Sequence, residues 1–278
     1  LIKIQVAKSP NSIEWKYYLL AIYREKNQYE DAINIVKEIK TLDADAYYDY
    51  ILSDLYQRLG DFETALQFAQ TACEADTADM SYQYDLIYVY GELNRFEDAL
   101  QIASQIIAKN PDSRGAYATR ADIYFNGQNY DQAIEDYSTV LAIKSTYHYA
   151  RYRRGYSYLL SGDTIKAKKD FKRLLQDADG EIEQVYAMLH LGMTDQTRAK
   201  VDSILLADSI YHYERYNIAC CYALLGETEL AFATLEDELK DGYTQFNHIR
   251  RDPDFISLRG ERLDSLLNIY ENRVQERV

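Results

Sequence analysis

The chain has 278 residues, with 31 Lys and Arg against 45 Asp and Glu, which gives a formal net charge of −14. Nucleic-acid affinity comes mainly from cations that neutralise phosphates, so this balance argues against a nucleic-acid binder and against docking on anionic membranes. No apolar run approaches the ~18 residues of a membrane span. Only 3 Pro and 11 Gly accompany 28 Tyr, and so few breakers indicate helices joined by tight turns.

The first nine residues, LIKIQVAKS, end directly in front of Pro10. They predict the last turns of a helix, because proline cannot continue a helix and is common just beyond its end. The next helices follow from a pattern that recurs along the rest of the chain.

A short pattern that joins a turn to an alanine recurs from residue 27 onwards. Its first five alanines are spaced 33 or 34 residues apart, and two weaker copies follow at spacings of 32: Ala32, Ala65, Ala99, Ala133, Ala167, Ala199 and Ala231. A tyrosine stands nine residues before the alanine in six copies, and His190 takes its place in the sixth. Because alanine lets two helices approach closely, the pattern predicts seven pairs of helices, each of about a dozen residues.

This pattern resembles the tetratricopeptide repeat, a helix–turn–helix unit of about 34 residues. The family's small residue in the first helix is matched by Ser53, Ala121, Gly155, Ala187 and Ala219, and its aromatic residue before the second helix by Tyr29, Phe62, Phe96 and Tyr130. Its closing proline is matched only by Pro10 and Pro111. The resemblance implies an all-α fold, a right-handed α-solenoid of seven repeats over residues 13–242.

The two ends of the chain are predicted to differ from the repeats. Residues 1–12 fit the tail of a truncated repeat, so we expect the natural protein to extend upstream; a short capping helix is the alternative. Residues 243–278 are predicted to be a C-terminal capping segment and helix. They resemble the tail of many bacterial arrays of this family, on Ile249, Arg250, Asp252, Pro253, Phe255, Leu258 and Arg259. Leu263, Leu266, Leu267 and Tyr270 then fall at helical spacing.

The sequence contains no motif that carries chemistry. No phosphate-binding loop, metalloprotease or hydrolase motif is present. The four histidines fall in different repeats, and Cys73, Cys220 and Cys221 show no metal-binding spacing. We therefore predict no enzyme activity, no metal and no cofactor. Free thiols favour a reducing compartment, the cytoplasm, but the compartment stays undetermined and the periplasm remains open.

Two groups of basic residues stand out against the acidic total. Lys166, Lys168, Lys169, Lys172 and Arg173 lie on one predicted second helix. They are first interpreted as a solvated face, with a site for phosphate or an acidic partner as the alternative. The second group comes from first helices of adjacent repeats and is predicted to pair with Asp122, Asp136 or Asp170: Arg120, Arg151, Arg153 and Arg154.

The resemblance also implies which positions face the concave groove of the array. By the family pattern these are positions two, five and nine of each unit, and ten of the 21 residues there are tyrosine. In the sixth unit, counted from Ala199, they are Glu181, Gln184 and Met188. The candidate partner-binding residues of the groove are Tyr17, Tyr47, Tyr50, Asp54, Tyr84, Tyr88, Ala118, Asp122, Tyr149, Tyr152, Tyr156, Tyr213 and Tyr216.

A groove of this composition favours protein recognition, because tyrosine offers a large contact area at low entropic cost. The prediction is a non-enzymatic scaffold for an extended peptide or partner protein, neutral to basic because Asp54 and Asp122 line the groove. Two alternatives stay open: a regulatory or substrate-presenting C-terminal module of a larger enzyme, such as a peptidase or kinase, and a carbohydrate-binding repeat protein. The oligomeric state is left open.

Overall fold

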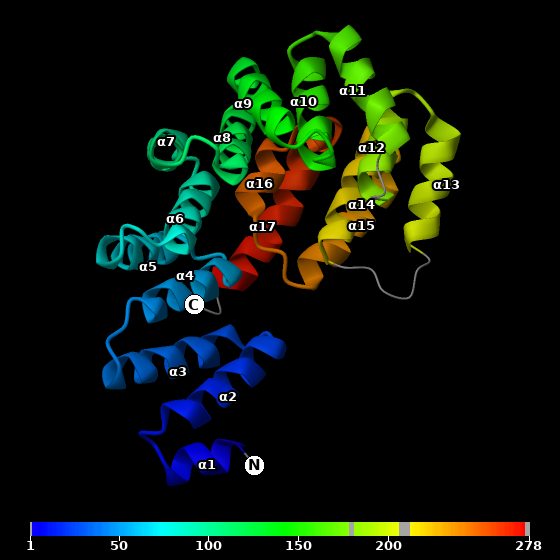
Figure 1. Ribbon diagram of the computed structural model, residues 1–278. Helices are drawn as coiled ribbons and strands as arrows, with labels where there is room; N and C mark the ends of the chain where they lie inside the picture. The colour runs from blue at the N-terminus through cyan, green and yellow to red at the C-terminus, as the bar shows by residue number, and fades with distance from the viewer. Residues whose placement is uncertain (1, 178–180, 206–211, 276–278) are drawn as a thin grey trace. The chain divides into compact units, whose positions relative to one another are not determined.

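The computed structural model describes residues 2–177, 181–205 and 212–275, and the regular structure in these ranges is helical, without a β-strand. The chain divides into two compact units. The first comprises residues 1–95, 244–246 and 268–278, and the second comprises 96–243 and 247–267. The helices of each unit follow one another as hairpins along the chain (Figure 1). None of the described helices is both long and apolar enough to cross a membrane.

The helix boundaries show the pairs that the sequence predicts. The first unit contains α1 (Ile2–Lys8), α2 (Ile13–Glu25), α3 (Tyr29–Leu42), α4 (Tyr47–Arg58), α5 (Phe62–Ala75) and α6 (Met80–Glu92). Residues of the second unit form α7 (Phe96–Lys109), α8 (Arg114–Asn126), α9 (Tyr130–Ile143), α10 (His148–Leu160), α11 (Thr164–Asp177), α12 (Glu181–His190), α13 (Thr194–Leu205), α14 (His212–Leu224) and α15 (Thr228–Lys240). The last elements are α16 (Phe246–Arg251), the 3-10 helix η1 (Pro253–Leu258) and α17 (Glu261–Gln275).

The pattern alanines lie one turn inside the second helix of their pair and are fully buried in six copies: Ala32, Ala65, Ala99, Ala133, Ala167 and Ala231. Several first helices begin at a residue whose side chain accepts a hydrogen bond from the first turn, as Ser12, Asp79 and Ser113 do. The predicted all-α fold of helix–turn–helix units is therefore confirmed.

The turns between the paired helices repeat one backbone geometry. Each has a residue with φ between 54° and 91° at the same place: Asn27, Gly60, Asn94, Gln128, Gly162, Gly192 and Gly226. The N–H of the next residue donates to the carbonyl of the residue five positions back, for example from Asp61 to Tyr56. This is the left-handed ending typical of helix C-termini, and it fixes the phase of every repeat.

The sixth repeat corrects the sequence alignment. Its turn at Gly192 follows Gly162 by 30 residues, because α12 has 10 residues where α10 and α14 have 13. Met188, rather than His190, therefore occupies the tyrosine position, and Met193 N–H donates to its carbonyl. Thr197 occupies the close-approach position, fully buried.

Ala199, the residue predicted for that position, is exposed. Thr197 is tolerated at the close approach because its hydroxyl donates to the Met193 carbonyl at 2.9 Å. The corrected count also moves the predicted inward positions of this repeat from Gln184 and Met188 to Ile182 and Tyr186. The sequence pattern did not show this two-residue shift because Thr197 stands where the other repeats have alanine.

The predicted pairing of the arginines with buried aspartates is confirmed in the second unit. Arg120 donates two hydrogen bonds to the Asp136 carboxylate, at 2.7 and 2.8 Å. Arg154 donates two to the Asp170 carboxylate, both at 2.8 Å. Arg153 Nε lies 3.4 Å from Asp122 Oδ1. These charge-assisted bonds satisfy carboxylates that would otherwise be costly to bury.

Candidate functional site

Five tyrosines of the predicted groove lie on the first helices of the first unit, and we call them the first-unit tyrosine layer: Tyr17 of α2, Tyr47 and Tyr50 of α4, and Tyr84 and Tyr88 of α6. Tyr47 and Tyr88 are 45% and 37% exposed, and the other three are half-buried. The ring of Tyr50 lies 6.2 Å from that of Tyr47 and 5.5 Å from that of Tyr82. Tyr47 and Tyr50 therefore form adjoining aromatic surface, which rests on the buried ring of Tyr82.

The negative charge of Asp54, the predicted acid of this unit, is compensated by two arginines. Asp54 accepts from Arg24 Nη2 at 3.0 Å and from Arg58 Nε at 3.2 Å. Asp85, which the sequence did not single out, accepts from Gln57 Nε2 at 2.6 Å, and burial raises the pKa of its carboxyl. The first-unit tyrosine layer therefore carries less free negative charge than its composition suggested.

The second predicted acid, Asp122 of α8, is also paired. Its Oδ1 accepts from the hydroxyls of Tyr137 and Tyr149, the latter at 2.8 Å, and it faces Arg153. The guanidinium of Arg153 lies 3.7 Å from the ring centroid of Phe125. The groove pattern overlooked Arg153 because it lies one position beyond Tyr152. Ala118 is buried at 8% exposure and adds no open surface.

The tyrosines of the second unit are packed rather than open. We call Tyr149, Tyr152, Tyr156, Tyr186 and Tyr216 the second-unit tyrosine layer; Tyr149 is 36% exposed and the other four are buried. The side chain of Tyr213 lies outside the described residues. The ring of Tyr152 stacks on Tyr186 at 4.7 Å and on Tyr156 at 5.9 Å.

His190 completes this stack of rings. Its imidazole lies 4.8 Å from the ring of Phe171 and 4.9 Å from that of Tyr156. Burial lowers the pKa of His190 to about 4, so the ring is neutral near pH 7. Its Nε2 is buried without a hydrogen-bond partner in the described ranges.

The C-terminal capping segment covers this layer. The Tyr156 hydroxyl donates to Asp254 Oδ1 at 2.5 Å, and the Tyr216 hydroxyl donates to Asp252 Oδ2 at 2.7 Å. Phe255 is fully buried, with its ring edge-on to Tyr216 at 5.6 Å. The sequence predicted a cap but gave no sign that its aspartates and Phe255 would engage the groove tyrosines.

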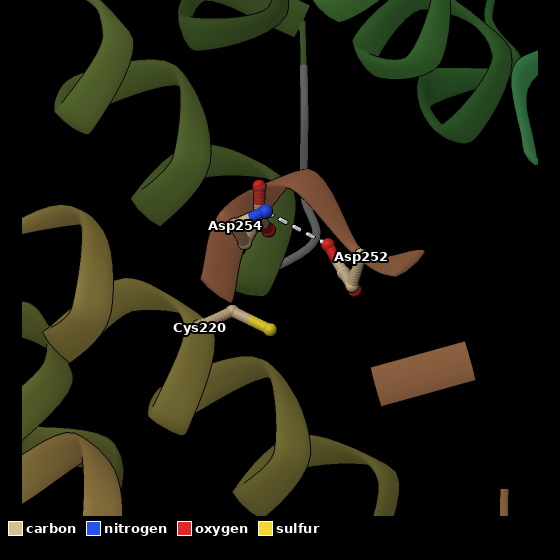
Figure 2. Close-up of side chains that lie close together, drawn as sticks. All are labelled: Cys220, Asp252 and Asp254. Atoms are coloured by element: carbon tan, nitrogen blue, oxygen red, sulfur yellow. Dashed lines mark hydrogen bonds between the residues drawn. The ribbon is translucent and has the colours of Figure 1, made fainter. Parts of the chain in front are cut away.

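Cys220 of α14 lies beside the two aspartates of this segment (Figure 2). Its Sγ and one oxygen each of Asp252 and Asp254 lie within 4.8 Å of one another, and Asp254 N–H donates to Asp252 Oδ1 at 2.9 Å. Burial raises the pKa of the Cys220 thiol and of the Asp254 carboxyl, whereas metal ligands must be deprotonated. With tyrosine hydroxyls already on both carboxyls, the cluster fits a hydrogen-bonded structural role better than a metal site.

Repeat models of the tetratricopeptide family match residues 50–79, 121–162 and 149–179. The first and last of these matches cover most of the pairs α4–α5 and α10–α11, and the match over 121–162 runs from α8 through α9 and α10. The chain is a tetratricopeptide repeat protein. One curated relative, a chloroplastic protein of Arabidopsis thaliana, is 42% identical over 57 residues, and this match spans 20% of the chain and only 17% of that protein.

Solved structures of tetratricopeptide proteins share the fold. A tetratricopeptide repeat protein from Parabacteroides merdae has a TM-score of 0.62 at 16% identity, covering 93% of this chain and 98% of that one. YrrB, described as a tetratricopeptide protein with an unusual peptide-binding site, has a TM-score of 0.51 at 16% identity, covering 67% and 96%. MamA has a TM-score of 0.52 at 22% identity, covering 59% and 91%. At these identities the likeness shows the fold alone.

Proposed function

We propose that this tetratricopeptide repeat protein is a non-enzymatic scaffold that binds an extended peptide or protein segment on the first-unit tyrosine layer. The observation that carries the proposal is the exposure of Tyr47 and Tyr88 on successive first helices, with Tyr50 and Tyr84 half-buried beside them. Tyrosines in this state offer ring faces to apolar partner side chains and hydroxyls to a partner backbone.

The second-unit tyrosine layer is a poorer candidate for the same role. Tyr152, Tyr156 and Tyr216 are buried, and two of their hydroxyls are engaged by Asp252 and Asp254. A partner there must first displace the capping segment, at the cost of those hydrogen bonds and of the buried Phe255. The unusual peptide-binding site of YrrB is consistent with peptide recognition by this fold.

The partner is proposed to be neutral and rich in apolar side chains. The sequence suggested a neutral to basic partner because of Asp54 and Asp122, and both carboxylates face arginines. An extended peptide with two or three apolar anchors suits the rings of Tyr47, Tyr50 and Tyr88, because buried anchors carry most binding energy.

The experiment is selection from a random peptide library on the full chain, followed by titration of the enriched peptides. Replacing Tyr50 and Tyr84 together by Ala is expected to weaken binding by about 2 kcal/mol or more, with helical content unchanged. Tyr18→Ala is the matched control, since this tyrosine of α2 is 50% exposed and stands outside the layer.

Equal binding by the double variant and the parent would place the peptide elsewhere and refute the proposal. Enrichment of glycans over peptides in a parallel array would favour the carbohydrate alternative instead. Tyr152 is not used in this test, because its replacement would open a cavity between Tyr156 and Tyr186.

A further inference from the structure

A basic pocket lies on the fifth helix pair, and none of its lining residues belongs to either tyrosine layer. It has a volume of about 950 Å³ and is lined from α10 by Arg151, Arg154 and Tyr158. The remaining lining comes from α11: Ile165, Lys166, Lys168, Lys169, Asp170, Lys172, Arg173 and Gln176. Seven of these residues are cations and one is an acid, in a chain whose net charge is −14.

Part of this positive charge is compensated within the protein. Arg154 grips Asp170, Lys166 lies 2.8 Å from Asp163, and Arg173 pairs with Asp177. Lys168, Lys169 and Lys172 make no ion pair with the described residues and are exposed. The pocket therefore keeps three uncompensated ammonium groups within about one and a half turns of one helix.

Arg151, which lines the pocket, has a hydrogen-bond donor that is not used. Its side chain is only 12% exposed, and its Nη1 lies 3.8 Å from Asp170 Oδ1, a long contact. Its Nη2 donates to the Ser145 carbonyl, while its Nε is buried without a hydrogen-bond partner in the described part of the chain. A buried, unmet guanidinium donor is costly, and an oxyanion is the group that such a donor binds best.

Of the described second helices, only α11 has lysine at all three places of Lys168, Lys169 and Lys172, although Lys37 of α3 matches the place of Lys172 and Arg198 of α13 that of Lys168. At the places of Lys168, Lys169 and Lys172, the preceding second helix α9 has Ile134, Glu135 and Ser138. The general repeat therefore does not require lysines here, and self-repulsion among them is unfavourable for the fold alone. The same helix also exposes Ile165 at 82% beside the cations, which gives the pocket an apolar edge.

We propose that the basic pocket is a second binding site, independent of the first-unit tyrosine layer, for a cluster of acidic or phosphorylated side chains on a partner protein. The shared chemistry is a group of oxyanions held by Lys168, Lys169 and Lys172 above Arg151. A long nucleic acid fits less well, because charge outside the pocket is strongly negative and repels the rest of a polyanion.

The test uses fluorescence anisotropy on the full chain with three labelled peptides of equal length, containing glutamate, phosphoserine or glutamine clusters. The acidic or the phosphorylated peptide is expected to bind, and binding should weaken steeply with added salt. Replacing Lys168 and Lys172 together by Glu should weaken it at least tenfold. The control pair Lys26→Glu and Lys109→Glu makes the same change of net charge at exposed lysines outside the pocket.

The outcomes separate the possibilities. Binding of the glutamate peptide identifies a carboxylate site, and binding of the phosphoserine peptide alone identifies a phosphate site; both support the proposal when only the pocket variant loses it. Equal losses in the two charge-matched variants, or equally tight binding of a labelled single-stranded DNA, would overturn it. Because the lysines replaced are exposed, circular dichroism should show an intact fold in either variant.

Discussion

Tyr47 and Tyr88 of the first unit keep 45% and 37% of their surface exposed, whereas Tyr152, Tyr156 and Tyr216 of the second unit keep 8%, 4% and 7%. All five occupy positions that the repeat pattern predicts to face inward. Residues 252–258 cover Tyr156 and Tyr216 through Asp254, Asp252 and Phe255. Tyr152 is covered instead by ring packing on Phe171 and Tyr186.

Position in the repeat pattern therefore does not by itself decide whether a tyrosine is covered. These five tyrosines are exposed in the first unit and buried in the second, although Tyr149 of the second unit also keeps 36% of its surface exposed. This comparison gives a series of tests, each of which asks whether a feature belongs to one unit or to the repeat itself.

The largest effect is expected from Phe255→Ala. Removing this fully buried ring leaves a cavity beside Tyr216 and should lower the free energy of unfolding by about 3–5 kcal/mol. Ile256→Ala is the control in the same segment, since Ile256 is 65% exposed, and should change it by less than about 0.5 kcal/mol.

Hydrogen exchange measured residue by residue shows where the loss falls. Protection should decrease in α10, α12 and α14 and stay unchanged in α2 to α5. A loss shared equally by both units would show that the capping segment does not stabilise the second-unit tyrosine layer in particular.

The next largest effect concerns pH. Burial raises the pKa of Asp254 to about 8, above the ~3.9 of an unfolded aspartate, so the folded state keeps a proton that the unfolded state has lost. This group's contribution to stability is complete below about pH 4 and is lost as pH rises to about 8. The facing groups are Asp252, whose charge raises this pKa further, and Tyr156 and Arg153, which lower it.

Asp254→Asn should remove that contribution to the pH dependence, because the amide stays neutral and its oxygen can still accept from Tyr156. The measurement is denaturant unfolding of both proteins at several values between pH 6.5 and 8. Parallel curves for the variant and the parent would show that Asp254 is already ionised at pH 6.5.

A smaller effect is expected from removing one hydroxyl in each unit. Tyr216→Phe breaks the hydrogen bond to Asp252 and should lower the free energy of unfolding by about 1.5–3 kcal/mol. Tyr50→Phe should change it by less than about 0.5 kcal/mol, because the Tyr50 hydroxyl makes no hydrogen bond with the described residues. Equal effects in thermal or denaturant unfolding would mean that the two layers are covered alike.

The corrected phase of the sixth repeat gives a test of comparable size. Thr197→Leu should overpack the buried close approach of α13 and cost about 1–3 kcal/mol. Ala199→Leu adds the same bulk two residues later, on an exposed position, and should change stability by less than about 0.5 kcal/mol. The reverse ranking of the two melting temperatures would restore the original alignment on Ala199.

The sequence predicted the repeating features well because they are local. Buried Ala32 and Ala133 follow from one spacing, and Arg154 pairs with Asp170 of the next helix, only 16 residues along the chain. Two features could not be predicted from the sequence, for physical reasons. Thr197 can replace alanine because its hydroxyl bonds to its own helix, and Asp254 reaches Tyr156 across 98 residues, a contact that no periodicity encodes.

The smallest effect concerns the turns, where both units should behave alike. Gln128 adopts φ of 61°, a left-handed conformation that is unfavourable for a residue with a long side chain. Gln128→Gly relieves this strain. Glycine also gives the unfolded chain more conformational entropy, which opposes folding, so the net stabilisation should be only about 0.5 kcal/mol. Asn94→Gly, at φ of 57° in the first unit, should change stability by a few tenths at most, because asparagine tolerates this region. If both substitutions proved destabilising by about 1 kcal/mol in denaturant unfolding, side-chain contacts rather than backbone geometry would hold these turns.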